Sequence, residues 1–352
     1  RGCGHYADGN AWRNRRRDTR VRAWAAGQQL NAPLKARGMS QKNLPILALK
    51  LLLSGGLILW ITRDVALDSV FAVIESANLA LLGLAFSLFF VGYIISAFRW
   101  RTLMRAQGGN APILYLIRSF MVALFFNNFL PSTVGGDVVR MYDSWRVGGS
   151  KSDAVAVVLV DRFLGVLVLL CFALIALTLD QAVVGQIPLI GWWVAAGIGG
   201  AALLAWLALN IPATRIDALA TNSGGLAKII ASALTKILGS FQVYRSASSA
   251  ILRAFVLSVL LQINVVVHFV LIARGVGIMV PVESMFLIVP VAIFVMMLPL
   301  SINAIGVREA IFVFFFSLYG VPDFQALALA WVSYGFTLIQ GVLGGIVFAV
   351  RR

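Results

Sequence analysis

The sequence NNFLPSTVGGDVVR, at residues 127–140, ends an apolar stretch with a proline, two glycines and charged residues. The segment LPLSINAIGVRE, at residues 298–309, ends another apolar stretch in a similar way. Proline removes a backbone donor and glycine weakens a helix, so each segment predicts a helix that is interrupted inside an apolar region. Paired interrupted helices in the two halves of a chain are typical of transporters that bind a substrate at the bilayer midplane.

The sequence around the two segments also repeats, because each is preceded by an apolar span and followed by another. The segment that joins the repeats carries apolar residues at helical spacing. This spacing predicts a helix that lies in the membrane interface or, on the same pattern, packs across the cytoplasmic ends of other helices. The predicted parts are repeat units at about residues 79–179 and 251–350, a span at 188–209 and an amphipathic helix at 225–241.

Composition places most of the chain in a membrane. Of its 352 residues, 60% are hydrophobic and 12% are charged, whereas about a quarter of the residues in a soluble domain are charged. This excludes a soluble enzyme. Several apolar runs reach the roughly 20 residues that cross a bilayer core. We therefore predict an all-α polytopic membrane protein with about six full spans and two re-entrant hairpins of opposite orientation, which form an inverted repeat.

The distribution of Lys and Arg predicts the topology, since loops rich in these residues stay in the cytoplasm. Residues 1–42 hold ten Lys or Arg and two Asp, so they contribute +8 to the formal net charge of +15 of the chain. If all the basic loops lie inside, each interrupted helix must return to the face from which it entered. We expect a multi-pass protein of the inner membrane with both termini in the cytoplasm. The basic segments are residues 1–42, 99–105, 215–253 and 351–352. The predicted domains are a disordered basic tail at residues 1–43 and a membrane domain at 44–352.

Polar residues near the interruptions are the candidates for a substrate site. An ionised side chain at membrane depth costs roughly 2.5–3.5 kcal/mol on insertion scales, so such residues usually have a partner or a function. They fall at the first interruption, in the span that follows it and at the second interruption. The candidates are Asn127, Asn128, Ser132, Gly136, Asp137 and Arg140, then Asp161 and Arg162, then Asn303, Gly306, Arg308 and Glu309.

The chemistry of these residues favours an anionic ligand. Neighbours on a helix point about 100° apart, so we expect Asp161 and Arg162 to reach different helices, with Arg140 and Arg308 as their partners. Arginines near broken helix ends suit a phosphate head group, because a guanidinium can bind phosphate with two hydrogen bonds. The alternative is that the charges form structural ion pairs that hold the interrupted helices together.

Other polar features carry weaker signals for function. Asn264 and His268 lie four residues apart on one helix face, a spacing that favours hydrogen bonds between helices over a proton relay. The chain has two His and no G-x-x-x-x-G-K-[ST] loop, so we predict no catalytic triad, metal site, cofactor or ATP hydrolysis. We expect the bilayer and a membrane lipid as partners and no specific nucleic acid, and an oligomer stays possible.

The segments NNFLPSTVGGDVVRMY, VVLVDRFLGV and LPLSINAIGVREAIF together resemble the transmembrane domain of lysylphosphatidylglycerol synthases and their stand-alone flippase-like relatives. The resemblance implies movement of an anionic phospholipid or a lipid-linked, glycosylated phosphate across the membrane. Two positions depart from the family pattern: Asp137 stands where Glu is commoner, and Asn303 and Ala304 stand where paired Gly is expected. The aminoacyl-transfer domain of the two-domain members is not in this sequence, so we expect no synthesis of an aminoacyl lipid.

Two other functions remain open from the residues alone. One is an enzyme or enzyme accessory that acts on a sugar linked to polyprenyl phosphate, with Asp137 or Asp161 as its base. The other is a membrane scaffold that recruits partners through the basic tail.

Overall fold

The computed structural model describes residues 44–63, 65–129, 135–148, 150–179, 189–210, 226–298 and 300–351. Every regular element within these ranges is a helix. The predicted tail at residues 1–43 and the site candidate Ser132 lie outside the described residues. The helices are α2 (Leu44–Thr62), α3 (Leu67–Glu75), α4 (Leu79–Ala106), α5 (Ile113–Phe129), α6 (Gly135–Val147), α7 (Lys151–Leu179), α9 (Ile190–Asn210), α11 (Leu226–Ser246), α12 (Ser248–Gly275), α13 (Val282–Met297), η2 (Ile302–Ala304), α14 (Val307–Ser317) and α15 (Asp323–Val350).

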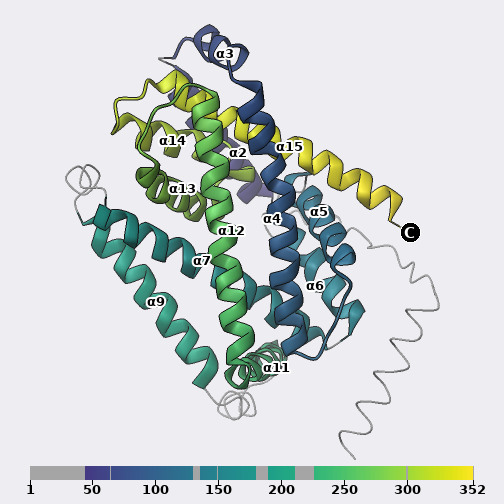
Figure 1. The fold of residues 1–352 in the computed structure, drawn as a ribbon. Coiled ribbons are helices and arrows are strands. Elements are labelled where there is room, and N and C mark those ends of the chain that lie inside the picture. Colours follow the sequence, from purple (N-terminus) through teal and green to yellow (C-terminus); the bar gives the residue numbers. More distant parts are fainter. Residues whose placement is uncertain are drawn as a thin grey trace, which may run out of the picture.

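The order of helix lengths repeats along the chain. Helices α4, α5, α6 and α7 contain 28, 17, 13 and 29 residues, and α12, α13, α14 and α15 contain 28, 16, 11 and 28. We call α4 to α7 the first unit and α12 to α15 the second unit. Helix α4 descends from α3 and α12 climbs from α11, so the two units begin in opposite directions (Figure 1).

The two units pack against each other through corresponding helices. Helix α4 lies along α12, α5 packs against α15, and α13 packs against α7. The first short helix of each unit therefore contacts the last helix of the other unit, whereas α6 and α14 pack on the last helix of their own unit. Glycines permit the closest of these approaches, because a Cβ atom on Gly344 of α15 would lie 2.1 Å from the carbonyl oxygen of Met121 in α5.

Four of the described helices are long and apolar enough to cross a membrane. They lie at Leu79–Ala106, Lys151–Thr178, Ser248–Gly275 and Asp323–Val350, the first and last helices of the two units. The fold is thus that of an all-helical, multi-pass membrane protein, as predicted. The finer prediction of about six spans and two re-entrant hairpins is not confirmed. Helices α5 and α13, with 17 and 16 residues, extend about 24–26 Å, which is less than the hydrocarbon core.

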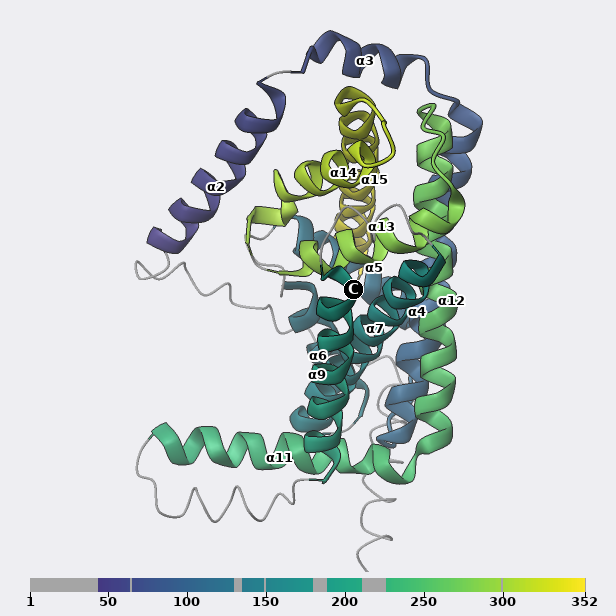
Figure 2. The same cartoon turned by 90° about the vertical axis from the view of Figure 1, so that its left-hand side faces the viewer.

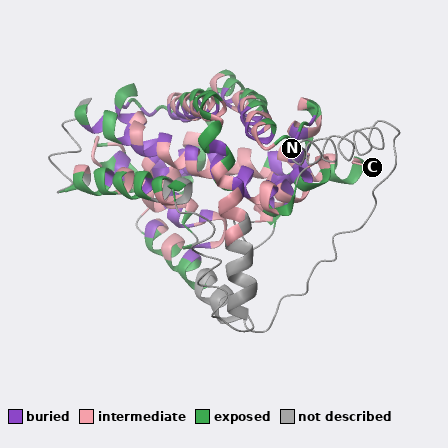
Figure 3. Cartoon of the chain, turned by 90° about the horizontal axis from the view of Figure 1, so that it is seen from below, coloured by how far each residue is buried: buried purple, intermediate pink, exposed green. Residues whose placement is uncertain are grey.

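The outward faces of the helices carry many apolar side chains. Buried residues line the contacts between helices, and exposed residues cover the outward faces (Figure 3). Those outward faces carry large exposed apolar side chains, among them Phe98, Trp192 and Ile346. Exposed apolar surface of this extent is typical of a protein that contacts lipid tails.

Helix α11 runs across the lower ends of α4 and α12 (Figure 2). A helix was predicted here, and its final turns pack on other helices. The Tyr244 hydroxyl donates a hydrogen bond to the carbonyl of Leu103 at 3.2 Å, and Ser240 Oγ donates to Asp153 Oδ1 at 2.8 Å. Burial raises the pKa of Tyr244 above its ordinary value. The second of the two alternatives, packing across helix ends, therefore describes this part of α11.

Candidate functional site

The first interruption lies between α5 and α6 and is stabilised by the last turns of α5. Asn127 Oδ1 accepts a hydrogen bond from the backbone N–H of Gly136 at 2.7 Å. Only glycine fits at position 136, because a Cβ atom there would lie 2.4 Å from the carbonyl oxygen of Ala123. An asparagine at the end of one short helix thereby holds a donor at the start of the next, whose first N–H groups have no partner within the helix.

The second interruption lies between α13 and α14. Asn303 adopts a left-handed conformation with φ 53°, and Gly306 precedes α14 with φ +83°. Glu309 Oε2 accepts a hydrogen bond from the Gly306 N–H at 2.7 Å. The buried Glu309 carboxylate thus satisfies a free donor at the start of α14, where the helix dipole also favours a negative charge.

The two interruptions meet. Asn128, at the end of α5, donates from Nδ2 to the carbonyl of Thr337 in α15 at 2.8 Å. Asn303 Nδ2 in turn approaches the carbonyl of Asn128 at 3.5 Å. Asn128 and Asn303 therefore bond to backbone where the two units touch, and Asn127 bonds to backbone within the first unit; none of the three lines the cavity described below.

A cluster of paired charges lies beside the first interruption. Asp161 of α7 is 1% exposed and sits between two arginines, with Oδ1 2.5 Å from Arg99 Nε and Oδ2 2.8 Å from Arg140 Nη2. Arg99 also donates from Nη1 to Ser258 Oγ of α12 at 2.9 Å. This buried triad links α4, α6 and α7, and through Ser258 it reaches the second unit.

Arg162 and Asp137 form a second pair in the same cluster. Arg162 Nε donates to Asp137 Oδ2 and Arg162 Nη2 donates to Asp137 Oδ1, both at 3.0 Å. This two-bond geometry is the strongest form of an arginine–carboxylate pair. Asp161 and Arg162 therefore reach different partners, as predicted. The Arg140 guanidinium also lies over the rings of Trp100 and Phe120, whose centroids are 4.8 and 4.5 Å from its Cζ atom.

Arg308 has no carboxylate within ion-pair distance among the residues the structure describes, so the expectation that it pairs with Asp161 is wrong. Its guanidinium instead lies over the ring of Tyr334, 4.7 Å from the centroid. Arg308 is 9% exposed, and its Nη1 has no hydrogen-bond partner. Asp161 instead has Arg99 as its second arginine partner, and Arg99 lies within helix α4 rather than in a loop.

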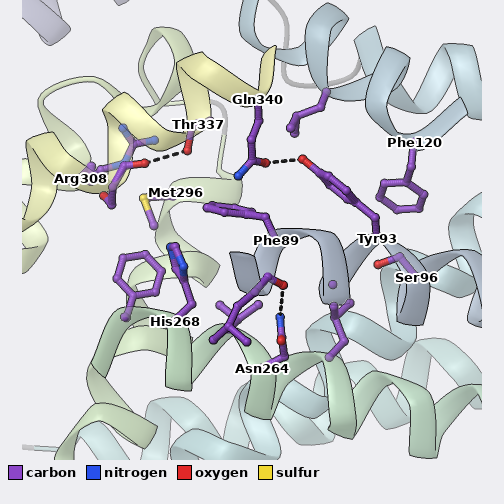
Figure 4. A pocket seen from close by; sticks show the side chains of 17 residues that line it. Phe89, Tyr93, Ser96, Phe120, Asn264, His268, Met296, Arg308, Thr337 and Gln340 are labelled. Carbon is purple, nitrogen blue, oxygen red and sulfur yellow. Dashed lines mark hydrogen bonds between the residues drawn. The ribbon is translucent and has the colours of Figure 1, made fainter. Parts of the chain in front are cut away.

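A cavity of about 280 Å³ lies between the two units (Figure 4). It is lined by residues of α4, α5, α12, α13, α14 and α15, and its walls are mostly apolar. Arg308 lies at one end and Phe120 at the other, with Gln340 and Tyr93 between them (Figure 4). The ring of Phe120, which lines the cavity, also lies 4.5 Å from the Cζ atom of Arg140, which does not line it.

Two hydrogen-bond donors in this cavity wall are unsatisfied. Arg308 Nη1 is one, and Gln340 Nε2 is the other; Gln340 is 2% exposed. The Tyr93 hydroxyl of α4 donates to Gln340 Oε1 across the boundary between the units, which turns the amide so that Nε2 remains free. A buried donor without a partner is costly and needs an explanation, and a bound acceptor-rich ligand would provide one.

Residues 47–345 match the family described as the lysylphosphatidylglycerol synthase TM region. The chain belongs to this family. The match confirms the resemblance inferred from the three sequence segments. A UPF0104 membrane protein of Pyrococcus horikoshii is 27% identical to the chain over 103 residues, which are 28% of this chain and 31% of that relative. The matched part is thus less than a third of the length of the relative.

Within this family fold, the sequence patterns locate the charged cluster better than the cavity. Gly136, Asp137, Arg140, Asp161 and Arg162 lie together, whereas Arg308 lies apart from them in the cavity wall. The structure adds three residues that the sequence analysis did not select. They are Arg99, Tyr93 and Gln340.

Asn264 and His268 of α12 also line the cavity, and both bond to the backbone of α4. Asn264 Nδ2 donates to the carbonyl of Leu88 at 3.1 Å, and His268 Nδ1 lies 2.8 Å from the carbonyl oxygen of Ala85. The predicted role in hydrogen bonding between helices agrees with this geometry. Within the described residues, no group of three or more His, Cys, Asp or Glu side chains could hold a metal ion.

Proposed function

We propose that the chain moves a lipid with an anionic, phosphate-containing head group across the inner membrane, with both termini in the cytoplasm and the bilayer as its working environment. The observation that carries this proposal is the cavity between the two units. It is mostly apolar, yet it holds a buried arginine with an unpaired donor at one end. An apolar cavity with one cationic end suits a lipid, whose head group meets the arginine while its tails remain among apolar side chains.

The position of the cavity supports movement of the lipid. Its walls come from both units, which begin in opposite directions and exchange contacts between corresponding helices. A rocking motion of one unit against the other would open such a cavity to one face of the membrane and then to the other. We propose that the short helix pairs α5–α6 and α13–α14 dip into the membrane as re-entrant hairpins, which brings both interruptions to the midplane.

The paired carboxylates favour transport over catalysis. Asp137 and Asp161 are the residues that could serve as the base of a lipid-linked transferase. Each already accepts hydrogen bonds from arginines, and neither lines the cavity. We therefore assign these residues to the support of the interrupted helices. The chain has no G-x-x-x-x-G-K-[ST] loop, so we propose movement down a gradient or coupled to ions.

The test is lipid movement in proteoliposomes that contain a tail-labelled anionic phospholipid. In Arg308→Gln, the rate should fall to that of protein-free vesicles. The matched control is Arg253→Gln, which removes an exposed arginine of α12 and should leave the rate unchanged. Equal rates for Arg308→Gln and the unmodified chain would reject this site. Chemical conversion of the lipid by the purified chain would favour the enzyme instead.

A further inference from the structure

The cavity offers at most one positive charge to a ligand. Among the residues that line it, Arg308 is the one Lys or Arg side chain, and none is Asp or Glu. His268 packs its buried ring against Phe89 and Phe269, with centroids 4.4 and 5.2 Å apart. Such an aromatic environment favours the neutral ring, because burying a charge without a partner is costly.

The other arginines of the charged cluster all have carboxylate partners. Arg99 and Arg140 share Asp161, and Arg162 is paired with Asp137 by two hydrogen bonds. These three arginines and two aspartates leave one net positive charge in the cluster, but none of the three arginines lines the cavity. Glu309, the residue next to Arg308, adds no positive charge, and its carboxylate is satisfied by the Gly306 N–H. No second guanidinium among the described residues therefore faces a ligand beside Arg308.

From this charge count we propose that the cavity selects a lipid phosphodiester, which carries one negative charge on its phosphate, over a phosphomonoester, which carries two. The inference rests on the proposed function and specifies its substrate class. A phosphodiester head group pairs with Arg308 and accepts a further hydrogen bond from Gln340 Nε2. A phosphomonoester dianion brings a second charge into a mostly apolar cavity, where nothing among the lining residues neutralises it.

Tyr93 and Gln340 determine this selectivity in the proposal. The Tyr93 hydroxyl fixes the Gln340 amide, so that the second donor to the phosphate is neutral. Because α4 supplies the tyrosine and α15 the glutamine, this neutral donor is assembled only when the two units are together. A lysine at position 340 would place a second cation in the cavity and should reverse the preference.

The experiment compares two tail-labelled lipids that differ by one methyl group, phosphatidylmethanol and phosphatidate, in phosphatidylcholine proteoliposomes of the full chain. At about pH 8 the diester should move about tenfold faster, because a phosphate monoester, whose second pKa is about 6 in phosphorylated side chains, gains a second negative charge as the pH rises. At about pH 5 the monoester is singly charged, and the difference should narrow. Equal rates at about pH 8, or faster movement of phosphatidate, would overturn the inference.

Titration of the protein must be separated from titration of the lipid. The titratable and charged groups around the cavity are Tyr93 on α4, His268 on α12, Arg308 and Glu309 on α14, and Tyr334 on α15. Groups that affect both lipids equally cancel in the ratio of the two rates. His268 can gain a charge at low pH, so the narrowing should persist in His268→Gln. Its loss in that variant would place the titration on the histidine and overturn the inference.

A charge variant tests the same idea at a single pH. Gln340→Lys should favour phosphatidate over phosphatidylmethanol at about pH 8. Gln325→Lys, near the start of the same helix and outside the cavity lining, should keep the preference of the unmodified chain. An unchanged preference in a folded Gln340→Lys protein would count against the inference. Failure of the unmodified chain to move either lipid would overturn the proposed function as well, whereas equal movement of both would overturn the selectivity alone.

Discussion

At both interruptions a side-chain oxygen accepts a hydrogen bond from the N–H of a glycine at the start of the next helix, but the charged residues nearby have different partners. At the first, between α5 and α6, three arginines and two aspartates form a cluster in which every charged group has an opposite partner. At the second, between α13 and α14, Arg308 has an aromatic ring as its partner, and one of its donors is unpaired. The difference teaches that buried charges beside broken helices need not have the same environment: those at the first interruption have opposite charges as partners, whereas Arg308 has none within ion-pair distance among the described residues.

The largest effect should follow from breaking the paired cluster. In Asp161→Asn, the two buried arginines Arg99 and Arg140 lose their shared carboxylate. Removing one partner of a buried ion pair typically costs about 3–5 kcal/mol. We expect a large drop in the thermal unfolding temperature in detergent, or loss of folded protein, whereas Asp68→Asn on the exposed face of α3 should change little. An unchanged unfolding temperature would show that the charged cluster does not stabilise the fold.

A smaller effect should follow from crowding the first interruption. In Gly136→Ala, the new methyl group would lie 2.4 Å from the backbone oxygen of Ala123 and 2.7 Å from Asn127 Nδ2. Overpacking of this kind typically costs about 1–3 kcal/mol. Gly335→Ala in α15 is the control, since nothing lies within 4 Å of its Cβ position, and alanine favours a helix. Equal stability of the two variants would mean that the first interruption is looser than the contacts indicate.

The comparison also shows how far the sequence could predict this molecule. Proline, glycine and long apolar runs act locally, so the helix order, the two interruptions and the helix between the units were all predictable. Burial of Arg99 was not, because the positive-inside rule cannot distinguish a solvated arginine at a helix end from one with a buried carboxylate. Arg99 does fall on the same face of α4 as the buried Ser96 and Leu103, and this spacing was a usable signal.

The cavity could not be predicted for a related reason. Tyr93 and Gln340 are neutral and lie in apolar helices far apart in sequence, so neither a charge nor the neighbouring residues identify them as candidates for a site. Their pairing depends on how α4 and α15 pack. The sequence identified Arg308 as a charged residue in an apolar region, but it predicted the wrong partner for Arg308. Spacing along the chain does not determine which of several buried carboxylates a guanidinium can reach.

A further contact ties the second unit to the first and should matter less than the cluster. Arg351, after the end of α15, donates from Nη1 to Asp143 Oδ2 of α6 at 2.8 Å. Burial alone lowers the pKa of Arg351, but the hydrogen bond and charge of Asp143 outweigh this and raise it. Asp143 also accepts hydrogen bonds from Tyr115 and Ser119, so the loss of Arg351 leaves it partly satisfied.

For this reason Arg351→Gln should cost about 1–2 kcal/mol, the range of a partly exposed hydrogen bond to a charged group. The measurement is again the unfolding temperature, with Arg245→Gln on the exposed face of α11 as the control. If Arg351→Gln destabilised the protein as much as Asp161→Asn, the contact between the units would be as strong as the cluster within the first unit. The contact at the end of α15 would then belong with the Asp161 cluster among the main stabilising interactions of the fold.

The smallest effect on stability should come from Arg308, the residue with the largest proposed effect on function. A buried guanidinium with an unpaired donor contributes little to folding, so Arg308→Gln should change the free energy of unfolding by less than about 1 kcal/mol in either direction. The same variant is expected to lose lipid movement. A stable but inactive protein would show that Arg308 is retained for a ligand. A loss of stability comparable to that of Asp161→Asn would instead show that Arg308 has a structural role, and the two interruptions would then be alike.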